Sequence, residues 1–179
     1  MVRTAGLKNY SNVHFTDRKV ASDIIRFYDP QGRVLEPFRG DGAFFDPLQE
    51  HLNLKQGSVL DWCEIEQGRD FLAYPDRVDW IITNPPFSTL TEMMAKSFET
   101  AKNTVFLIPI SKYFSSAPRI NLSKSMAGLK HMLHVGTGRD IGFDIGFPFA
   151  AMHFQRGYTG PIFEDNLSEW RESQDKRIA

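Results

Sequence analysis

The feature that most constrains the fold is a series of short apolar runs that alternate with segments of helical periodicity. The runs are residues 33–38, 58–65, 78–83 and 104–109, which read RVLEPF, SVLDWCEI, VDWIIT and TVFLIP. Each run is apolar along most of its length, as expected of strands that helices cover on both faces of a sheet. The sequence therefore predicts an α/β fold with a mostly parallel central sheet and helices on both faces.

Three segments beside these runs have the periodicity of helices. They are residues 16–28, 47–52 and 89–101. Thr16 is a candidate cap for the first helix, and Pro47 fits only the first turn of the second. Thr89 and Glu92 have the spacing of a capping box at the start of the third.

The pattern changes after Leu129. Residues 131–135 and 147–154 predict a closing pair of antiparallel strands. The glycine-rich residues 136–146 form a long and mobile connection between them. We therefore expect the parallel sheet to end in a C-terminal antiparallel hairpin.

Length and composition predict a single domain. The chain has 179 residues, enough for one well-buried domain and too few for two of ordinary size. Its 41% hydrophobic and 24% charged residues exclude a disordered or fibrous protein. We expect one domain over residues 1–179, with residues 1–13 and the polar tail 158–179 loosely attached. Trp170 is the candidate anchor of that tail.

The sequence favours a cytoplasmic protein. The single cysteine, Cys63, excludes an intramolecular disulfide and suits a reducing compartment. The N-terminal residues lack the apolar core of a signal peptide, and no run approaches the ~20 apolar residues that cross a bilayer. We therefore expect no membrane segment.

Charge is distributed unevenly along the chain. The formal net charge of −1 gives no overall attraction to nucleic acid, but no acidic residue occurs between Glu99 and Asp140. The charged residues of that stretch are all basic, namely Lys102, Lys112, Arg119, Lys124, Lys130 and Arg139, and it also contains His131 and His134. It predicts a positive face, or alternatively a set of solvated charges whose acidic neighbours come from elsewhere in the fold.

A glycine turn follows the first predicted strand, where open α/β sheets bind ligands. Residues 36–42 read EPFRGDG, so Gly40 and Gly42 allow a sharp turn and close approach to a ligand. A dinucleotide fingerprint would need a third glycine where this chain has Phe45, which argues against a dinucleotide site. On its own the glycine pair also fits a simple turn between a strand and a helix.

Acidic and aromatic residues follow the second strand. Glu64 ends this strand and can accept hydrogen bonds from both hydroxyls of a ribose. Asp70 could accept from an adenine amino group, and the ring of Phe71 could lie against the base. The order of the three residues after a glycine turn favours a nucleoside-like ligand over unrelated surface groups.

The stretch TNPPF, residues 83–87, follows the third run. Pro85 and Pro86 fix their own backbone angles and restrict Asn84 to extended conformations, so acceptor oxygens are held rigidly at the sheet edge. If these oxygens accept both N–H bonds of an adenine amine, its nitrogen can pyramidalise and direct its lone pair at an electrophilic methyl group. Phe87 offers a ring for base stacking. Alternatively, the two prolines only build a turn.

Taken together, these motifs resemble those of S-adenosylmethionine-dependent amino-methyltransferases of the adenine-N6 class, which have (D/N/S)PP(Y/F) and F-x-G-x-G motifs. The matching pieces are HFTDRKVASDII, LEPFRGDGAFF, CEI, RDFL and DWIITNPPF, between residues 14 and 87, in the order of the gamma group of DNA adenine methyltransferases. The resemblance implies a Rossmann-like class I fold and an S-adenosylmethionine site at Thr16, Glu36, Pro37, Phe38, Gly40, Gly42, Glu64, Ile65, Asp70 and Phe71. It implies catalysis at Asn84, Pro85, Pro86 and Phe87. Nucleic acid would contact Phe87, Lys112, Arg119 and Arg139.

The chain departs from the family pattern in three ways. Thr16 is followed by Asp17, where the family usually has proline. Family members usually fit a helix and a strand between the residues that match Glu64 and Asp70, so we expect this crossover to be trimmed or missing, with Glu66 as an alternative acidic ligand. No target-recognition domain follows the core, as in small enzymes of phages and mobile elements.

The favoured function is methyl transfer from S-adenosylmethionine to adenine N6 in DNA, by direct in-line displacement. The alternatives are an RNA adenine or guanine amine methyltransferase, a protein-glutamine methyltransferase, and a non-catalytic cofactor-binding subunit. A partner subunit could supply target recognition. The cysteine and histidines lack the spacing of metal ligands, so we expect no metal.

Overall fold

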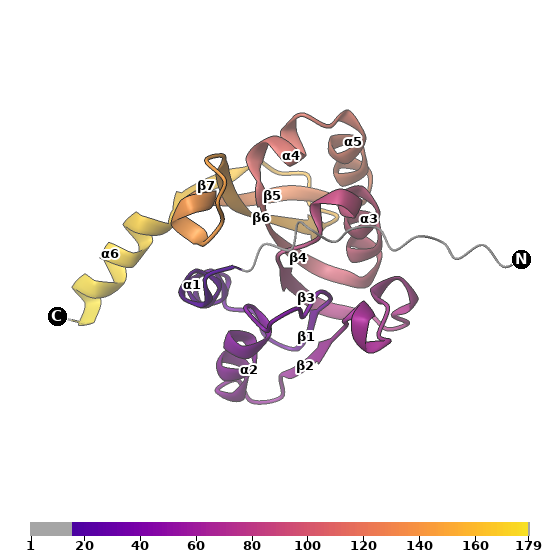
Figure 1. Cartoon of the computed structure of the whole chain (residues 1–179), viewed down its shortest axis with the longest axis horizontal. Helices are drawn as coiled ribbons and strands as arrows, with labels where there is room; N and C mark the ends of the chain where they lie inside the picture. The colour runs from indigo at the N-terminus through magenta and orange to yellow at the C-terminus, as the bar shows by residue number, and fades with distance from the viewer. Residues whose placement is uncertain (1–15, 179) are drawn as a thin grey trace, which may run out of the picture.

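A seven-stranded sheet forms the centre of the computed structural model, which describes residues 16–178 (Figure 1). The strands are β1 (Arg33–Glu36), β2 (Val59–Trp62), β3 (Val78–Thr83), β4 (Ala101–Pro109), β5 (Ala127–Thr137), β6 (Pro148–Arg156) and β7 (Phe163–Asn166). Their order across the sheet is β2-β1-β3-β4-β6-β5-β7. Strands β1 to β4 are parallel, and β6 runs antiparallel to β4 and β5. The predicted α/β class with a C-terminal antiparallel hairpin is confirmed.

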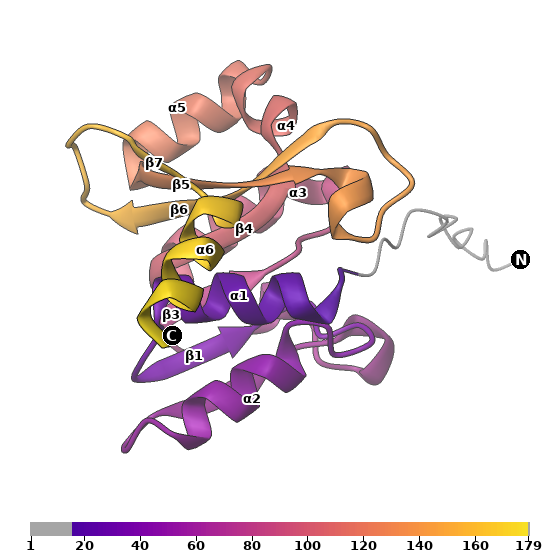
Figure 2. The ribbon, with the colours of Figure 1, turned by 90° about the vertical axis from the view of Figure 1, so that its left-hand side faces the viewer.

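Helices cover both faces of the sheet (Figure 1 and Figure 2). One face packs against α1 (Arg18–Tyr28), α2 (Phe45–Asn53) and α6 (Leu167–Ile178). The other face packs against α3 (Leu90–Thr100), α4 (Ile110–Phe114) and α5 (Ala117–Met126). Among residues 16–178, no helix is both long and apolar enough to cross a bilayer.

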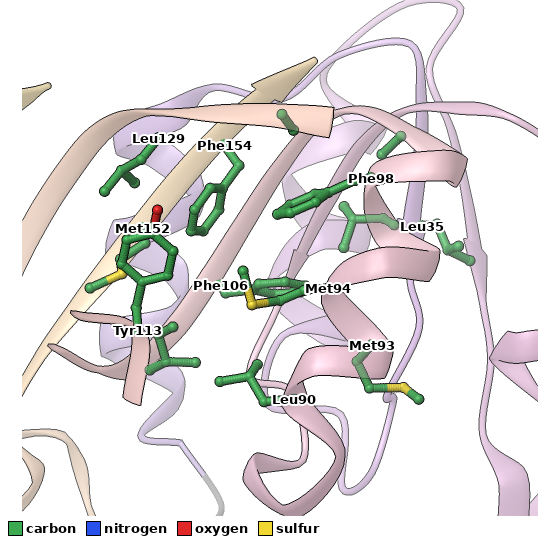
Figure 3. Packing of buried hydrophobic residues seen from close by; sticks show 14 of the residues in the cluster. Leu35, Leu90, Met93, Met94, Phe98, Phe106, Tyr113, Leu129, Met152 and Phe154 are labelled. Carbon is green, nitrogen blue, oxygen red and sulfur yellow. The ribbon is translucent and has the colours of Figure 1, made fainter. Parts of the chain in front are cut away.

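The continuous apolar runs form the central strands because both of their faces are buried. In β3, Ile81 and Ile82 are both fully buried, and they belong to the cores on opposite faces of the sheet. Figure 3 shows the core beneath α3, where Phe98 and Phe106 lie near Phe154 of β6. Replacing one such ring by alanine would cost about 3–5 kcal/mol.

Two predicted helix caps differ from the observed ones. Helix α1 is capped by Asp17, whose carboxylate accepts from the backbone nitrogens of Lys19 at 2.8 Å and Val20 at 3.2 Å. Thr16 is therefore not the cap. Thr89 is the N-cap residue of α3, but its side chain makes no capping hydrogen bond, so the predicted capping box is not formed.

The crossover between β2 and β3 is trimmed, as the spacing predicted. It contains only two 3-10 turns, η1 (Ile65–Gln67) and η2 (Phe71–Ala73). Phe71 and Tyr74 are buried in the core on the α3 side and cover the sheet there. The Tyr74 hydroxyl donates to Asp61 of β2 at 3.0 Å. Because this crossover contains no strand, β2 forms one edge of the sheet.

The C-terminal tail is fastened to the domain, contrary to the expectation of a loose attachment from residue 158. Strand β7 pairs in parallel with β5. The Trp170 ring meets Phe27 edge-on at 5.8 Å, and Arg171 pairs with the buried Asp23 at 2.7 Å. Trp170 thus packs where an anchor was predicted. Residues 1–13, expected to be loosely attached, lie outside the described residues, as do the first two residues of the HFTDRKVASDII motif.

Candidate active site

The predicted motifs meet at the end of the sheet where strands β1 to β5 terminate, here called the carboxyl edge. Glu36 is the last residue of β1, Glu64 follows β2, and Asn84 follows β3. Lys112 lies in α4, directly after β4. Because parallel strands end on the same side, residues far apart in sequence come together here.

Glu36 is buried at the carboxyl edge, with 1% of its surface exposed. Its Oε1 accepts from the Thr83 hydroxyl at 2.5 Å and from the Phe38 backbone nitrogen at 2.9 Å. Burial raises the pKa of this carboxyl to about 8, and the charge of Glu64 acts in the same direction, whereas the two hydrogen bonds act against it. Sequence reasoning missed Thr83, although a hydroxyl that ends an apolar strand was a visible signal.

The glycine loop turns as predicted. Gly40 and Gly42 have φ values of 49° and 87°, a left-handed conformation that favours glycine. Glu64 Oε2 accepts from the Gly40 backbone nitrogen at 2.8 Å, and Oε1 accepts from that of Glu66 at 3.3 Å. Since each carboxylate oxygen can accept two hydrogen bonds, Glu64 retains acceptor capacity for a ligand.

Arg39 of the same loop stacks on aromatic rings. Its guanidinium carbon lies 4.4 Å from the centroid of Phe45 and 4.6 Å from that of Trp62. Arg69 lies 4.2 Å from the Trp62 centroid. These contacts join three separate segments, so no local pattern could have indicated them. They hold the loop against α2 and β2.

The two residues predicted at an adenine differ in exposure. Asp70 is exposed and its Oδ1 accepts from the Leu72 backbone nitrogen at 2.9 Å. Phe71 is only 3% exposed, and its ring meets Phe38 edge-on at 5.5 Å. The expectation of an open Phe71 face is thereby corrected, because the trimmed crossover uses this ring as core. The apolar side chain open to solvent beside Glu64 is Ile65, which is 61% exposed.

Asn84 is oriented by the segment before α1. Its Nδ2 donates to the buried Thr16 hydroxyl at 3.2 Å, which leaves Oδ1 on the opposite side of the amide. Pro85 is buried, and Pro86 is exposed. The half-buried Phe87 ring packs on the core, with its centroid 6.1 Å from that of Phe149. The NPPF turn therefore holds Asn84 and Phe87 in fixed positions at the carboxyl edge.

The basic stretch divides between the two ends of the sheet. Lys112 and Arg139, of the 3-10 turn η4 (Gly138–Ile141), are exposed at the carboxyl edge. The guanidinium of Arg119 donates to the backbone oxygen of Lys112 and to the Thr91 hydroxyl. The lysines Lys102, Lys124 and Lys130 lie toward the opposite end of the sheet. His131 and His134 pair with acidic residues of β7.

The glycine-rich connection lies at the carboxyl edge. The Ile141 backbone oxygen accepts from the Asp17 backbone nitrogen at 3.0 Å, so η4 contacts the start of α1. Ile141 and Phe143 are buried. Among residues 16–178, no three His, Cys, Asp or Glu side chains are grouped so that they could hold a metal ion.

Comparison with known proteins identifies the fold class of this chain. No protein-family model and no curated protein matches the chain. A modification subunit of a putative type I restriction enzyme from Vibrio vulnificus YJ016 is similar, with 18% identity, a TM-score of 0.61, and coverage of 86% of this chain and 46% of that one. A putative class I S-adenosylmethionine-dependent methyltransferase from Listeria monocytogenes has 12% identity, a TM-score of 0.60, and coverage of 90% and 67%.

An RNA-related structure is also similar. A putative RNA methyltransferase from Pyrococcus horikoshii has 17% identity, a TM-score of 0.54, and coverage of 85% of this chain and 91% of that one. The chain thus has the Rossmann-like fold of the class I methyltransferases. It spans slightly less than half the length of the Vibrio modification subunit.

Proposed function

We propose that this protein transfers a methyl group from S-adenosylmethionine to the exocyclic N6 amine of adenine in DNA. The observation that supports this most directly is the position of Asn84 at the carboxyl edge, beside the glycine loop, with its amide oriented by Thr16. Direct in-line displacement requires no covalent enzyme intermediate.

The residues around the glycine loop fit S-adenosylmethionine. The bound cofactor would supply an electrophilic methyl group on a positively charged sulfur. Glu36, Glu64 and Asp70 give the site acceptors for a cation and for ribose hydroxyls, and Ile65 would offer an apolar surface to the adenine ring. A Cβ on Gly42 would lie 3.0 Å from Asp46 Oδ1, a tight contact, and the φ of 87° at this position disfavours any residue with a side chain.

The NPPF turn would prepare the acceptor amine. Asn84 Oδ1 and the Pro85 carbonyl accept its two N–H bonds, which directs the nitrogen lone pair toward the methyl group. Pro85 and Pro86 keep these acceptors in place without reorganisation, a large source of rate enhancement in rigid sites. The Phe87 ring stacks on the base, a contact worth about 1–3 kcal/mol in single-strand binders.

The substrate would be held at its phosphates by Lys112, Arg119 and Arg139. Contacts of this kind position a substrate without reading its sequence. We therefore propose weak intrinsic sequence preference, with target recognition supplied by a partner subunit. Single-stranded or distorted sites should react more easily, because unstacking a base from a duplex costs a few kcal/mol.

RNA is the second candidate substrate. The similar putative RNA methyltransferase is matched over 91% of its length, which means that a domain of about this extent accounts for nearly all of that protein. The same Asn84 and Phe87 geometry would serve an unpaired adenine or guanine in RNA. Methylation of a protein glutamine and a purely non-catalytic role are weaker alternatives, because neither requires a base-stacking ring at Phe87.

Tritiated methyl transfer to DNA, RNA and protein pools in parallel tests the proposal. We expect labelling of DNA, and a loss of about 10²–10³-fold in rate for Asn84→Ala, the size seen when one preorganised donor or acceptor is removed. Cofactor binding by this variant should be nearly unchanged. The matched control is Asn53→Ala, at the exposed C-terminal end of α2, away from the carboxyl edge. Near-normal transfer by Asn84→Ala would refute the catalytic role of the turn.

A further inference from the structure

One oxygen atom connects the glycine loop to the strand that leads to Asn84. Glu36 Oε1 accepts from the Phe38 backbone nitrogen at 2.9 Å and from the Thr83 hydroxyl at 2.5 Å. Thr83 is 1% exposed and immediately precedes Asn84. Any change in the charge of Glu36 therefore acts on both halves of the candidate site.

Glu36 has no cationic partner among residues 16–178. Its two hydrogen bonds come from neutral donors, and the charged group that acts on it, from the loop after β2, is another carboxylate, Glu64. The buried Cys63 thiol, whose pKa burial raises to about 11, lies close enough for the charges of Glu36 and Asp70 to act on it. The neighbouring arginines are engaged elsewhere: Arg18 with Asp46, Arg39 with Phe45 and Trp62, and Arg69 with Asp61.

A carboxylate in these surroundings is unstable relative to the neutral acid. Burial without a counter-charge penalises the ionised form, and two neutral donors offset only part of that penalty. Both hydrogen bonds of Glu36 fall on Oε1, and Oε2 makes none with the described residues, so Oε2 can hold the proton. The raised pKa of about 8 agrees with this geometry.

We propose that Glu36 is protonated in the cofactor-free protein and loses its proton when the cationic cofactor binds, so that binding is transmitted to Asn84 through Thr83. This inference rests on the S-adenosylmethionine site proposed above. The O–H bond of the carboxyl group breaks, the proton passes to the solvent buffer, and the carboxylate charge balances the positive charges of the sulfonium and ammonium groups. The Thr83 hydrogen bond to the ionised group is then stronger and holds the end of β3 more firmly.

Calorimetry of S-adenosylmethionine binding to the full chain tests the proton release. Titrations at pH 7 in buffers of different ionisation enthalpy should show close to one proton released for each cofactor bound, falling toward zero as pH rises above about 8. Glu36→Gln should abolish this release, while Glu50→Gln, on the exposed face of α2, should behave as wild type. Equal proton release by wild type and Glu36→Gln would overturn the inference even if both bind the cofactor.

A measurement without cofactor separates this inference from the proposed function. Because the folded pKa of Glu36 is raised, the folded protein binds more protons than the unfolded chain between about pH 4.3 and 8, so Glu36 lowers stability as pH rises through this window. Urea unfolding should therefore show Glu36→Gln gaining stability relative to wild type from pH 5 to 8. Parallel profiles would mean an ionised Glu36 and would refute the inference, whatever the cofactor result.

Thr83→Val separates the transmission step from the proton release. This variant keeps the Glu36 carboxyl group but removes the hydroxyl that joins it to β3. It should bind S-adenosylmethionine and release the proton as wild type does, but lose methyl transfer in kcat rather than in KM for the nucleic acid. Wild-type kcat in Thr83→Val would refute the coupling to Asn84.

Discussion

Replacement of Gly138 by alanine tests whether the connection between β5 and β6 is as closely packed as the structure shows. A Cβ at Gly138 would lie 2.4 Å from the Ile145 backbone oxygen and 3.1 Å from its Cβ. The carbonyl oxygen belongs to the backbone and cannot rotate away, so the connection must open. Gly138 is not among the glycines with positive φ, which makes this a test of packing and not of backbone strain.

The expected cost follows from that overlap. Overpacking a closed site costs about 1–3 kcal/mol, and each kcal/mol lowers the Tm of a protein of this size by about 2–4 °C. Gly146→Ala is the matched control in the same connection, because a Cβ there meets nothing within 4 Å. At such a position alanine should be neutral or should stabilise by about 0.4–1 kcal/mol. Urea and thermal unfolding would measure both variants, and equal stabilities would refute the packing argument.

Two further predictions concern ligand contacts at the carboxyl edge. Glu64→Ala should weaken S-adenosylmethionine binding by about 1.5–3 kcal/mol, or roughly 10–150-fold, the value of a charge-assisted hydrogen bond. Calorimetry on this variant and on Glu66→Ala measures the loss. A larger loss of affinity in Glu66→Ala would assign the ribose contact to Glu66. Lys112→Ala should weaken DNA binding and lower the log-log salt slope by roughly 0.7–0.9, whereas Lys102→Ala, at the opposite end of β4, should leave the slope unchanged. Identical slopes for the two lysine variants would remove Lys112 from the substrate surface.

The parts of the fold that the sequence predicted well are those where burial determines the pattern. The run at residues 78–83 coincides with β3 because its apolar side chains serve two cores at once. Strand β7 has no such pattern: all four of its residues are exposed, and its pairing with β5 defines it. Helix α5 was missed because its apolar residues form no clear stripe, and it begins directly after the short helix α4.

In the candidate site, too, positions set by a neighbouring strand were predicted, whereas contacts between distant segments were not. The positions of Glu64 and Asn84 at strand ends followed from the strands themselves. The hydrogen bond between Asn84 and Thr16 spans 68 positions in sequence, and Thr16 was predicted to have the capping role that Asp17 performs. Phe71 was expected to face a ligand because it follows Glu64 and Asp70 in the chain, but the sequence did not show that this ring would cover the sheet.

The trimmed crossover accounts for both the compactness of the site and the burial of Phe71. In the family that the sequence resembles, a helix and a strand usually follow β2, whereas here Phe71 and Tyr74 follow it and are buried in the core on the α3 side. Lys96 of α3 donates to the Tyr74 backbone oxygen at 2.8 Å, which fastens the short connection to the domain. The bridge between Glu64 and Arg69 then closes η1 into a tight loop and brings Asp70 back beside Glu64. Glu64 and Asp70 are therefore held within one short loop. Both remain at the carboxyl edge although the crossover contains no strand.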